Sequence, residues 1–198
     1  VTEAIAEEMH RDPMIFVMGQ GVGEYNARYN SLFLEGFDKS RLHDTGIIER
    51  FEAGASVGAA LTGSRPIVDL RNTSFGSLAY DEVFGKAGLW VYEHGGNGDM
   101  RVPIVFRMNF SSYQDGAAEH ARARTADYMH GVGIKVVVPS NAYEAKGLMK
   151  TAIRDNNPVV FLDEGELARN RAEIPDEEYL IPFGLARVLR EGDACTVV

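Results

Sequence analysis

The chain has 198 residues, of which 45% are hydrophobic and 25% charged, the proportions of an ordinary globular protein. This composition excludes intrinsic disorder, collagen-like repeats and a disulfide-rich scaffold, and the length allows one substantial domain with the start of another. Acidic residues outnumber basic ones by 29 to 20, which gives a formal net charge of −9. We therefore expect neither nucleic acid nor an anionic membrane as a partner.

The single cysteine, Cys195, has no second thiol to pair with, so disulfides and cysteine-based zinc sites are excluded and a reducing, cytoplasmic location is expected. No apolar run approaches the roughly 18 residues of a membrane span, and the acidic first residues do not resemble a signal peptide. The sequence begins with Val1 and ends inside an apolar run. We expect it to be a fragment of a longer protein.

The first apolar run, residues 14–18, predicts a strand, and Gly19, Gly21 and Gly23 follow it. A glycine cluster after a strand can bind phosphate at the start of a helix. The dinucleotide fingerprint, however, needs G-x-G-x-x-G before an apolar-faced helix, and the segment EYNARYN that follows here has no apolar face. We interpret the cluster as a flexible turn.

Residues 44–63 come next, where a polar loop leads into Glu49 and then into a helical pattern. Gly54 and Gly58, each followed by alanine, fall at four-residue spacing on this helix. Small residues at this spacing allow close approach of another backbone, either at a helix–helix subunit interface or in tight packing within one domain. A carboxylate in the first turn is favoured by the helix dipole, so Glu49 requires no function on this ground alone.

Further apolar runs predict strands at residues 66–70, 102–106, 134–138 and 158–162, and the last three runs are apolar throughout, as strands covered on both faces must be. Residues 141–156 have helical spacing, with Asn141 and Glu144 forming a start like a capping box. The glycines at 95, 96 and 98 predict a surface turn. Together these elements predict an α/β fold with a mostly parallel sheet and helices on both faces.

Polar residues between the strands predicted at 102–106 and 134–138 suggest two sites that we reject. Ser111, Asp115 and His120 have the residue types of a hydrolase triad, but no G-x-S-x-G elbow accompanies them. His120 and His130 lack the cysteine or HExxH partners of a protein-only metal site, so a structural role is the default for His130.

Long motifs resemble one family over nearly the whole chain: RLHDTGIIERFEAGASVGAAL, VPIVFRMN, AAEHARART and GIKVVVPSNAYEAKGLMKTAIRDNNPVVFLDE. They look like the β subunit of thiamine-diphosphate-dependent 2-oxo acid dehydrogenases of the pyruvate, branched-chain or acetoin type. The resemblance implies a transketolase-like, pyrimidine-binding domain over residues 1–177. Residues 178–198 would then be the truncated start of a C-terminal domain.

The resemblance also implies roles for individual residues. The family motif D-T-P-I-x-E stands here as residues 44–49, with Gly46 in place of proline, which makes Glu49 the carboxylate that hydrogen-bonds N1′ of the cofactor's aminopyrimidine. Phe75 matches the aromatic residue stacked on that ring, and Ile48 neighbours the cofactor by position. His120 matches the active-site histidine near the substrate or the lipoyl group, although the segment EHAR replaces the common Q-H-S-Q around it.

The same resemblance implies the partners and the reaction. The diphosphate and Mg²⁺ motif of the family is absent from this sequence, so an α-type subunit or a fused domain should hold thiamine diphosphate and Mg²⁺ from the other side, in a homo- or hetero-oligomer. The component would decarboxylate a 2-oxo acid and pass the acyl group to the lipoamide of an acyltransferase. Two alternatives stay open: a transketolase-type or acetoin-cleaving enzyme, and a non-catalytic assembly subunit in which Glu49 is only a helix-start carboxylate.

Overall fold

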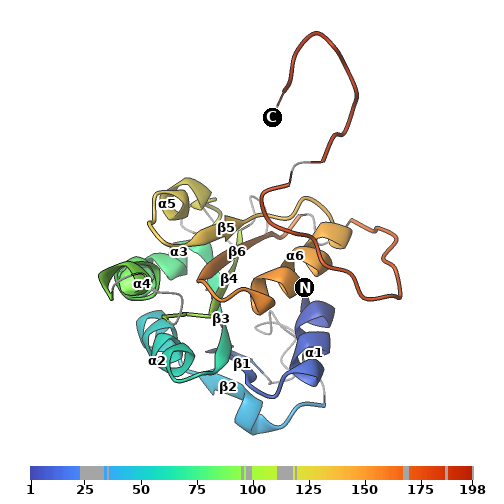
Figure 1. The fold of residues 1–198 in the computed structure, drawn as a ribbon. Coiled ribbons are helices and arrows are strands. Elements are labelled where there is room, and N and C mark those ends of the chain that lie inside the picture. Colours follow the sequence, from blue (N-terminus) through green and yellow to red (C-terminus); the bar gives the residue numbers. More distant parts are fainter. Residues whose placement is uncertain are drawn as a thin grey trace.

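Within the described residues, six parallel strands form one sheet in the order β2-β1-β3-β4-β6-β5 (Figure 1). The structure, a computed structural model, describes residues 1–22, 34, 36–94, 96, 100–110, 118, 120–166, 170–185 and 187–197. The strands are β1 (Ile15–Gln20), β2 (Leu42–Thr45), β3 (Arg65–Asn72), β4 (Val105–Phe110), β5 (Lys135–Val137) and β6 (Val159–Glu164). The predicted α/β fold with a parallel sheet is confirmed.

Helices cover both faces of this sheet, and each face has its own apolar core (Figure 1). On one face lie α1 (Thr2–Arg11) and α6 (Ala142–Arg154). The other face carries α2 (Glu49–Leu61), α3 (Thr73–Gly76), η2 (Ser77–Ala79), η3 (Asp81–Gly88), α4 (Leu89–Glu93) and α5 (Thr125–Met129), and the short turn η1 (Lys39–Arg41) precedes β2. Strands buried on both faces need apolar side chains at successive positions, which explains the continuous apolar runs.

The sequence predicted five of the strands and missed β2. The runs at 14–18, 66–70, 134–138 and 158–162 all overlap observed strands, whereas β4 begins three residues later than the predicted start at 102. The missed strand β2, with the sequence LHDT, is four residues long, lies at the edge of the sheet, and is mostly polar. A short polar edge strand has no apolar run by which it could be recognised.

Helix α6 begins as the sequence predicted, with one difference in its cap. The Asn141 side chain accepts a hydrogen bond from the backbone N–H of Glu144 at 2.9 Å, as an N-cap residue does. The Glu144 carboxylate, however, accepts hydrogen bonds from the backbone and hydroxyl of Ser140 at 2.9 and 2.6 Å, one residue before the expected partner.

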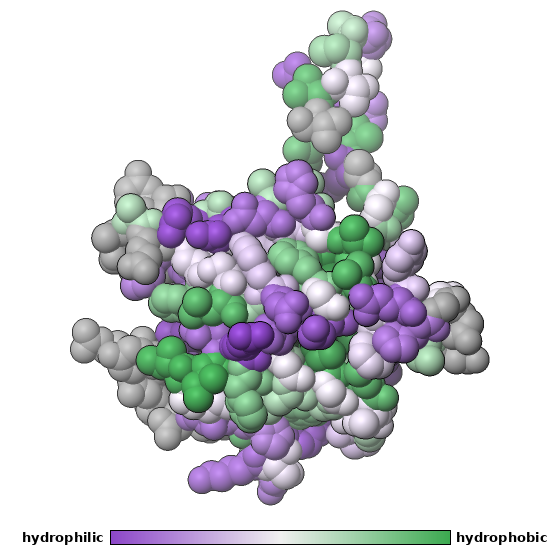
Figure 2. Space-filling model, turned by 90° about the vertical axis from the view of Figure 1, so that its left-hand side faces the viewer, coloured by the Kyte–Doolittle hydropathy of each residue, from purple (hydrophilic) through white to green (hydrophobic). Residues whose placement is uncertain are grey.

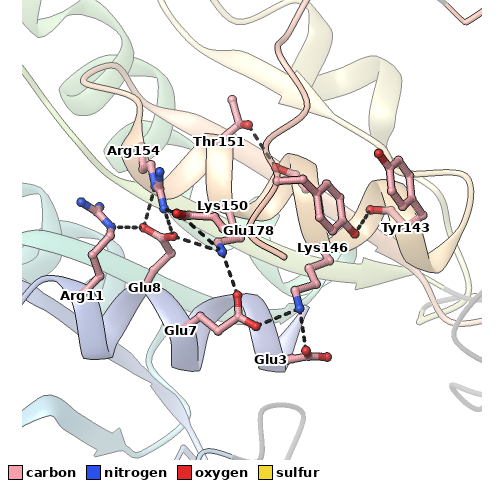
Figure 3. A network of polar contacts seen from close by, with 12 residues as sticks. Glu3, Glu7, Glu8, Arg11, Tyr143, Lys146, Lys150, Thr151, Arg154 and Glu178 are labelled. Carbon is pink, nitrogen blue, oxygen red and sulfur yellow. Dashed lines mark hydrogen bonds and ion pairs between the residues drawn. The ribbon is translucent and has the colours of Figure 1, made fainter. Parts of the chain in front are cut away.

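Helices α1 and α6 are joined by charged side chains rather than by apolar contacts alone (Figure 3). Acidic residues of α1 face basic residues of α6, and two members of this network, Glu8 and Lys150, are almost fully buried. The ion pairs are Lys146 with Glu3 and Glu7, Lys150 with Glu7 and Glu8, and Arg154 with Glu8. These pairs fix the packing of the first helix on the last one.

The segment after β6 lies against α6 before the chain leaves the sheet (Figure 1). The Tyr179 ring stacks on Tyr143 with 4.5 Å between centroids, and the Thr151 hydroxyl donates a hydrogen bond to the Ile181 carbonyl at 2.8 Å. Beyond Glu164, the residues that the structure describes form no helix or strand. The start of a second domain at residue 178 stays a prediction.

Glycines at the end of β1 permit a close approach between strands. A Cβ atom at Gly19 would lie 2.6 Å from the Asp69 carbonyl oxygen on β3, too close for any side chain. Gly21 has a φ of 72°, in the left-handed region, and its N–H donates to the Asp44 carboxylate at 2.7 Å. The predicted turn is therefore confirmed at Gly21, whereas it is wrong at Gly19, which lies inside β1 and pairs with both neighbouring strands. Gly23 lies outside the described residues.

Candidate active site

The three residues singled out by the family motif follow strands β2, β3 and β4 at the edge of the sheet where those strands end. Glu49 is the first residue of α2 after β2, Phe75 lies on α3 directly after β3, and His120 lies in the connection after β4. Carboxyl ends of parallel strands share one edge, where ligand sites of α/β proteins form. Helix α2 also packs against η2, which follows Phe75.

Phe75 and His120, 45 residues apart in the chain, are in direct contact. Their ring centroids are 4.9 Å apart with an angle of 68° between the planes, an edge-to-face arrangement, and both side chains are half-buried. The neighbouring side chains hold the His120 segment by its backbone: Asn72 Nδ2 donates to the His120 carbonyl at 2.5 Å, and the Thr73 hydroxyl donates to the Arg122 carbonyl at 2.6 Å.

Asn72 and Thr73 are supporting residues that the sequence analysis missed. Asn72 is buried and also caps α3, because its side-chain oxygen accepts a hydrogen bond from the Ser74 N–H at 2.8 Å. An asparagine before a short helical segment was the available signal for the cap. The contact with His120 depends on residues 48 positions away in the chain and had no local signal.

Glu49 is a buried residue whose neighbours along the chain include exposed apolar side chains. Its exposed fraction is 7%, whereas Ile48 before it is 54% exposed and Ile47 71%. Phe51 on the same helix and Leu78 on η2 are more than half exposed as well. The face that carries α2 and α4 accordingly shows green apolar patches among the purple surface (Figure 2). Exposed apolar patches of this kind typically mark an interaction surface.

A second carboxylate lies one helical turn further along α2. Glu52 is 1% exposed, and the Thr45 hydroxyl at the end of β2 donates a hydrogen bond to its carboxylate. Burial raises the pKa of Glu52 to about 7, the Thr45 hydrogen bond opposes the rise, and the negative charges of Glu49, Asp69 and Asp44 add to it. No pattern in the sequence singled out Glu52, because burial of one polar position on a helix depends on tertiary packing.

A buried row of charges crosses the sheet near the same edge. Arg107 on β4 donates to the Asp69 carboxylate on β3 at 3.2 and 3.3 Å and to the Asp163 carboxylate on β6 at 2.8 Å. Burial alone would lower the pKa of Arg107, but the two carboxylates raise it above its ordinary value. Arg107 therefore stays charged and connects three strands.

Among the described residues, nothing packs on the small-residue face of α2 at Gly58. A Cβ atom built on Gly58 would meet nothing within 4 Å, and one on Gly54 would meet only the Glu82 side chain, at 3.4 Å. Of the two interpretations of these glycines, tight packing inside one domain is not seen at Gly58 among the residues that the structure describes. A helix–helix subunit interface stays a prediction.

The two rejected sites from the sequence analysis add nothing to this edge of the sheet. Ser111 and Asp115 lie outside the described residues, as do Gly95 and Gly98. Among the residues that the structure does describe, no group of three or more histidine, cysteine or acidic side chains could hold a metal ion. No helix of this part is long and apolar enough to span a bilayer.

The described residues fit one side of thiamine diphosphate. A buried carboxylate beside an exposed apolar surface suits the ring nitrogen of an aminopyrimidine, and the aromatic Phe75 suits its face. The diphosphate and its Mg²⁺ need several oxygen ligands converging on one point. No such set occurs in the residues described.

Comparison with known proteins agrees with this arrangement. A family model described as "Transketolase, pyrimidine binding domain" matches residues 1–169. The chain is 43% identical over 198 residues to the pyruvate dehydrogenase E1 component subunit beta of Rickettsia felis, and 36% identical over 198 residues to the 2-oxoisovalerate dehydrogenase subunit beta of Bacillus subtilis. These alignments cover 99% and 98% of this chain, and the chain spans 60% of each relative.

The fold has solved counterparts at lower identity. A split-gene transketolase, described as an inactive β4 tetramer, matches 82% of this chain and 49% of its own with a TM-score of 0.65 at 18% identity. A transketolase mutant from Pichia stipitis matches 81% of this chain and 25% of its own with a TM-score of 0.63 at 15% identity. By sequence over residues 1–169 and by fold, the chain belongs to the family of transketolase pyrimidine-binding domains.

Proposed function

We propose that this chain is the pyrimidine-side part of the thiamine-diphosphate-dependent decarboxylase component of a 2-oxo acid dehydrogenase. The observation that carries the proposal is the buried Glu49 carboxylate, placed at the start of α2 and at the same sheet edge as the Phe75–His120 pair. A carboxylate with so little access to water interacts more strongly with a proton donor than an exposed one does.

Each residue of this edge has a role in the proposal. Glu49 holds a proton at the ring nitrogen of the aminopyrimidine, and Phe75 supports the face of that ring. When bound, thiamine diphosphate supplies the nucleophilic carbon that adds to the 2-oxo group and accepts the electrons released with CO₂. His120, held by Asn72, orients the substrate or the incoming lipoyl group. Ile48, exposed beside Glu49, contacts the cofactor or the partner chain.

A partner is part of the same proposal. The described residues can bind only the pyrimidine part of the cofactor, so an α-type subunit or fused domain supplies the ligands for Mg²⁺ and the diphosphate. The exposed apolar start of α2 and its unpacked glycine face are the surfaces that such an oligomer would cover. The acyl group would then pass to the lipoyl group of an acyltransferase.

The test replaces Glu49 by glutamine in the protein assembled with its partner. Glutamine keeps the shape but cannot stabilise a proton on the pyrimidine, so decarboxylation and reductive acylation of a lipoyl domain should fall by ~10²- to 10⁴-fold. Glu177→Gln, at an exposed position, is the control and should turn over at the parent rate. If Glu49→Gln is as active as this control with equal cofactor loading, the proposed function is wrong.

A further inference from the structure

Arg71, near the end of β3, has an unusual backbone and an unsatisfied side chain. Its φ is 64°, the only positive φ of a non-glycine residue among those the structure describes. The pairing of β3 with β4 shifts register between Asp69 and Asn72, so Arg71 lies in a bulge. Bulges redirect side chains, and a left-handed arginine costs roughly 1 kcal/mol or more, which makes this a conformation that the surrounding structure must impose.

Asp69, two residues earlier on β3, stabilises the bulge. Its carboxylate accepts a hydrogen bond from the Arg71 backbone N–H at 3.0 Å and is bonded at the same time by the Arg107 guanidinium. Asp69 is fully buried. The aspartate therefore fixes the Arg71 backbone while its own charge is compensated by another arginine.

The Arg71 guanidinium itself has no partner in the described structure. Its Nη1 atom is buried and forms no hydrogen bond, and no ion pair or side-chain hydrogen bond of Arg71 occurs. Arg124 also has a buried unpaired nitrogen, but it pairs with Asp127 through another one at 2.9 Å. Arg71 as a whole is half-buried, so one nitrogen of its guanidinium is removed from water without an acceptor, and an anion from outside the chain would supply that acceptor.

Arg71 directly precedes the residues that assemble the candidate site. Asn72 and Thr73 bind the backbone of residues 120 and 122, and Phe75 contacts the His120 ring. The segment that they hold brings Arg122 to this edge, at a position where the family motif commonly has glutamine. Arg71 and Arg122 thus belong to the two segments that meet at this edge. An unpaired guanidinium nitrogen next to such a site favours an anionic oxygen ligand.

We infer that Arg71 binds a second anionic oxygen group of the substrate, a carboxylate or phosphate at the end remote from the reacting carbonyl. The inference rests on the proposed function and adds a substrate class to it. The reacting carboxylate itself is a poor candidate, because it loses its charge as CO₂ departs, so an ion pair to it would stabilise the ground state more than the transition state. A remote anion keeps its charge throughout the reaction.

The test compares matched 2-oxo acids in the assembled protein. The substrates are 2-oxoglutarate, 2-oxo-4-phosphonobutanoate, which carries a phosphonate in place of the remote carboxylate, and 5-methyl-2-oxohexanoate. The last has an uncharged isopropyl group at the remote end and is called the neutral substrate for that reason. The native protein should prefer one of the two anionic substrates. Arg71→Met should lower kcat/KM for that substrate by ~10²-fold, mainly by raising KM. The kcat/KM of the variant for the neutral substrate should stay within about twofold of the native value. Arg71→Lys should recover part of the loss, and Arg190→Met, at an exposed position, should lose nothing.

A binding measurement separates this inference from the proposed function. Glutarate has no 2-oxo group to react, so calorimetric titration of the assembled protein with glutarate measures binding without turnover, and Arg71→Met should weaken this binding by at least ~10-fold. If the neutral 2-oxo acid is preferred, or if Arg71→Met affects all three substrates equally, the inference is wrong and the proposed function stands. If no 2-oxo acid reacts while glutarate binding depends on Arg71, the proposed function is wrong and the anion site is supported.

Discussion

Replacing Glu52 by glutamine tests whether a buried, neutral acid lies behind Glu49. Glu52 is 1% exposed, is bonded by the Thr45 hydroxyl, and lies one helical turn from Glu49. Burial, with the neighbouring negative charges of Glu49, Asp69 and Asp44, raises its pKa from 4.5 to about 7. At pH 6 the folded protein therefore keeps Glu52 protonated, whereas the unfolded chain has already released the proton.

The sign of the pH dependence follows from this difference. Because the folded-state pKa lies above the unfolded one, the stabilisation is complete below pH 4.5 and is lost as the pH rises through about 7. Each pH unit within this window costs ~1.36 kcal/mol. Between about pH 5 and 8, Glu52 should lower the free energy of unfolding by about 2 to 3 kcal/mol, and the loss should level off above the folded-state pKa.

This contribution is measured by denaturant unfolding of the native protein and of Glu52→Gln at about pH 5 and at about pH 8. Glutamine is neutral at every pH and its oxygen can still accept the Thr45 hydroxyl, so the variant should lack the loss of about 2 to 3 kcal/mol, while other titrating groups cancel in the comparison. The exposed control Glu177→Gln should follow the native protein. Equal pH dependence of the native protein and Glu52→Gln would refute the argument that Glu52 is buried as a neutral acid.

Coupling to Glu49 gives the same experiment a second readout. The charge of Glu49 contributes to the raised pKa of Glu52. Glu49→Gln should therefore lower the upper end of the pH range over which the titration of Glu52 reduces the free energy of unfolding. The double variant should show no such window at all. A window that is unchanged by Glu49→Gln would mean that the two carboxylates do not interact in the folded protein.

Two further predictions concern the supports of the site and of the fold. Asn72→Ala removes both the cap of α3 and the hydrogen bond to the His120 carbonyl. Thermal unfolding should therefore show that the free energy of unfolding falls by about 1 to 2 kcal/mol. Decarboxylation in the assembled protein should fall by ~10-fold, because His120 is no longer held in place. Glu8→Ala leaves Arg154 without its buried partner (Figure 3) and should cost about 3 kcal/mol, whereas Glu3→Ala, at an exposed position, should cost less than about 1 kcal/mol in the same measurement.

The strands that the sequence predicted are those whose burial leaves a local mark. Residues 158–162 are covered on both faces and are apolar at every position, so the pattern was sufficient. Strand β2 pairs with β1 alone and contributes only Leu42 to the core, so its sequence resembles a loop. The start of β4 was placed too early because residues 102–104 are buried and apolar like a strand, whereas the Ile104 N–H bonds back to the Val102 carbonyl at 2.9 Å and the regular strand begins only at Val105.

The candidate site was predicted only as far as its motif extended. The family motif identified Glu49, Phe75 and His120, and the contact between the two rings was not visible in the sequence. Arg71 and Glu52 carry no motif, because both are ordinary charged residues until the fold buries Glu52 and one nitrogen of Arg71. Whether a charged side chain is paired, neutral or unsatisfied depends on neighbours from other strands, and no local pattern records those neighbours.

The exposures along the start of α2 connect assembly with catalysis in the proposed function. Glu49 is already buried by its own chain, but Ile47 and Phe51 on either side of it are more than half exposed. A partner that covers these two side chains would gain apolar burial and would also exclude the remaining water near the carboxylate. Lower local polarity strengthens the interaction of Glu49 with a proton donor. The same contact would therefore hold the oligomer together and activate the carboxylate, so that a separated chain would be expected to lack activity even with Glu49 correctly folded.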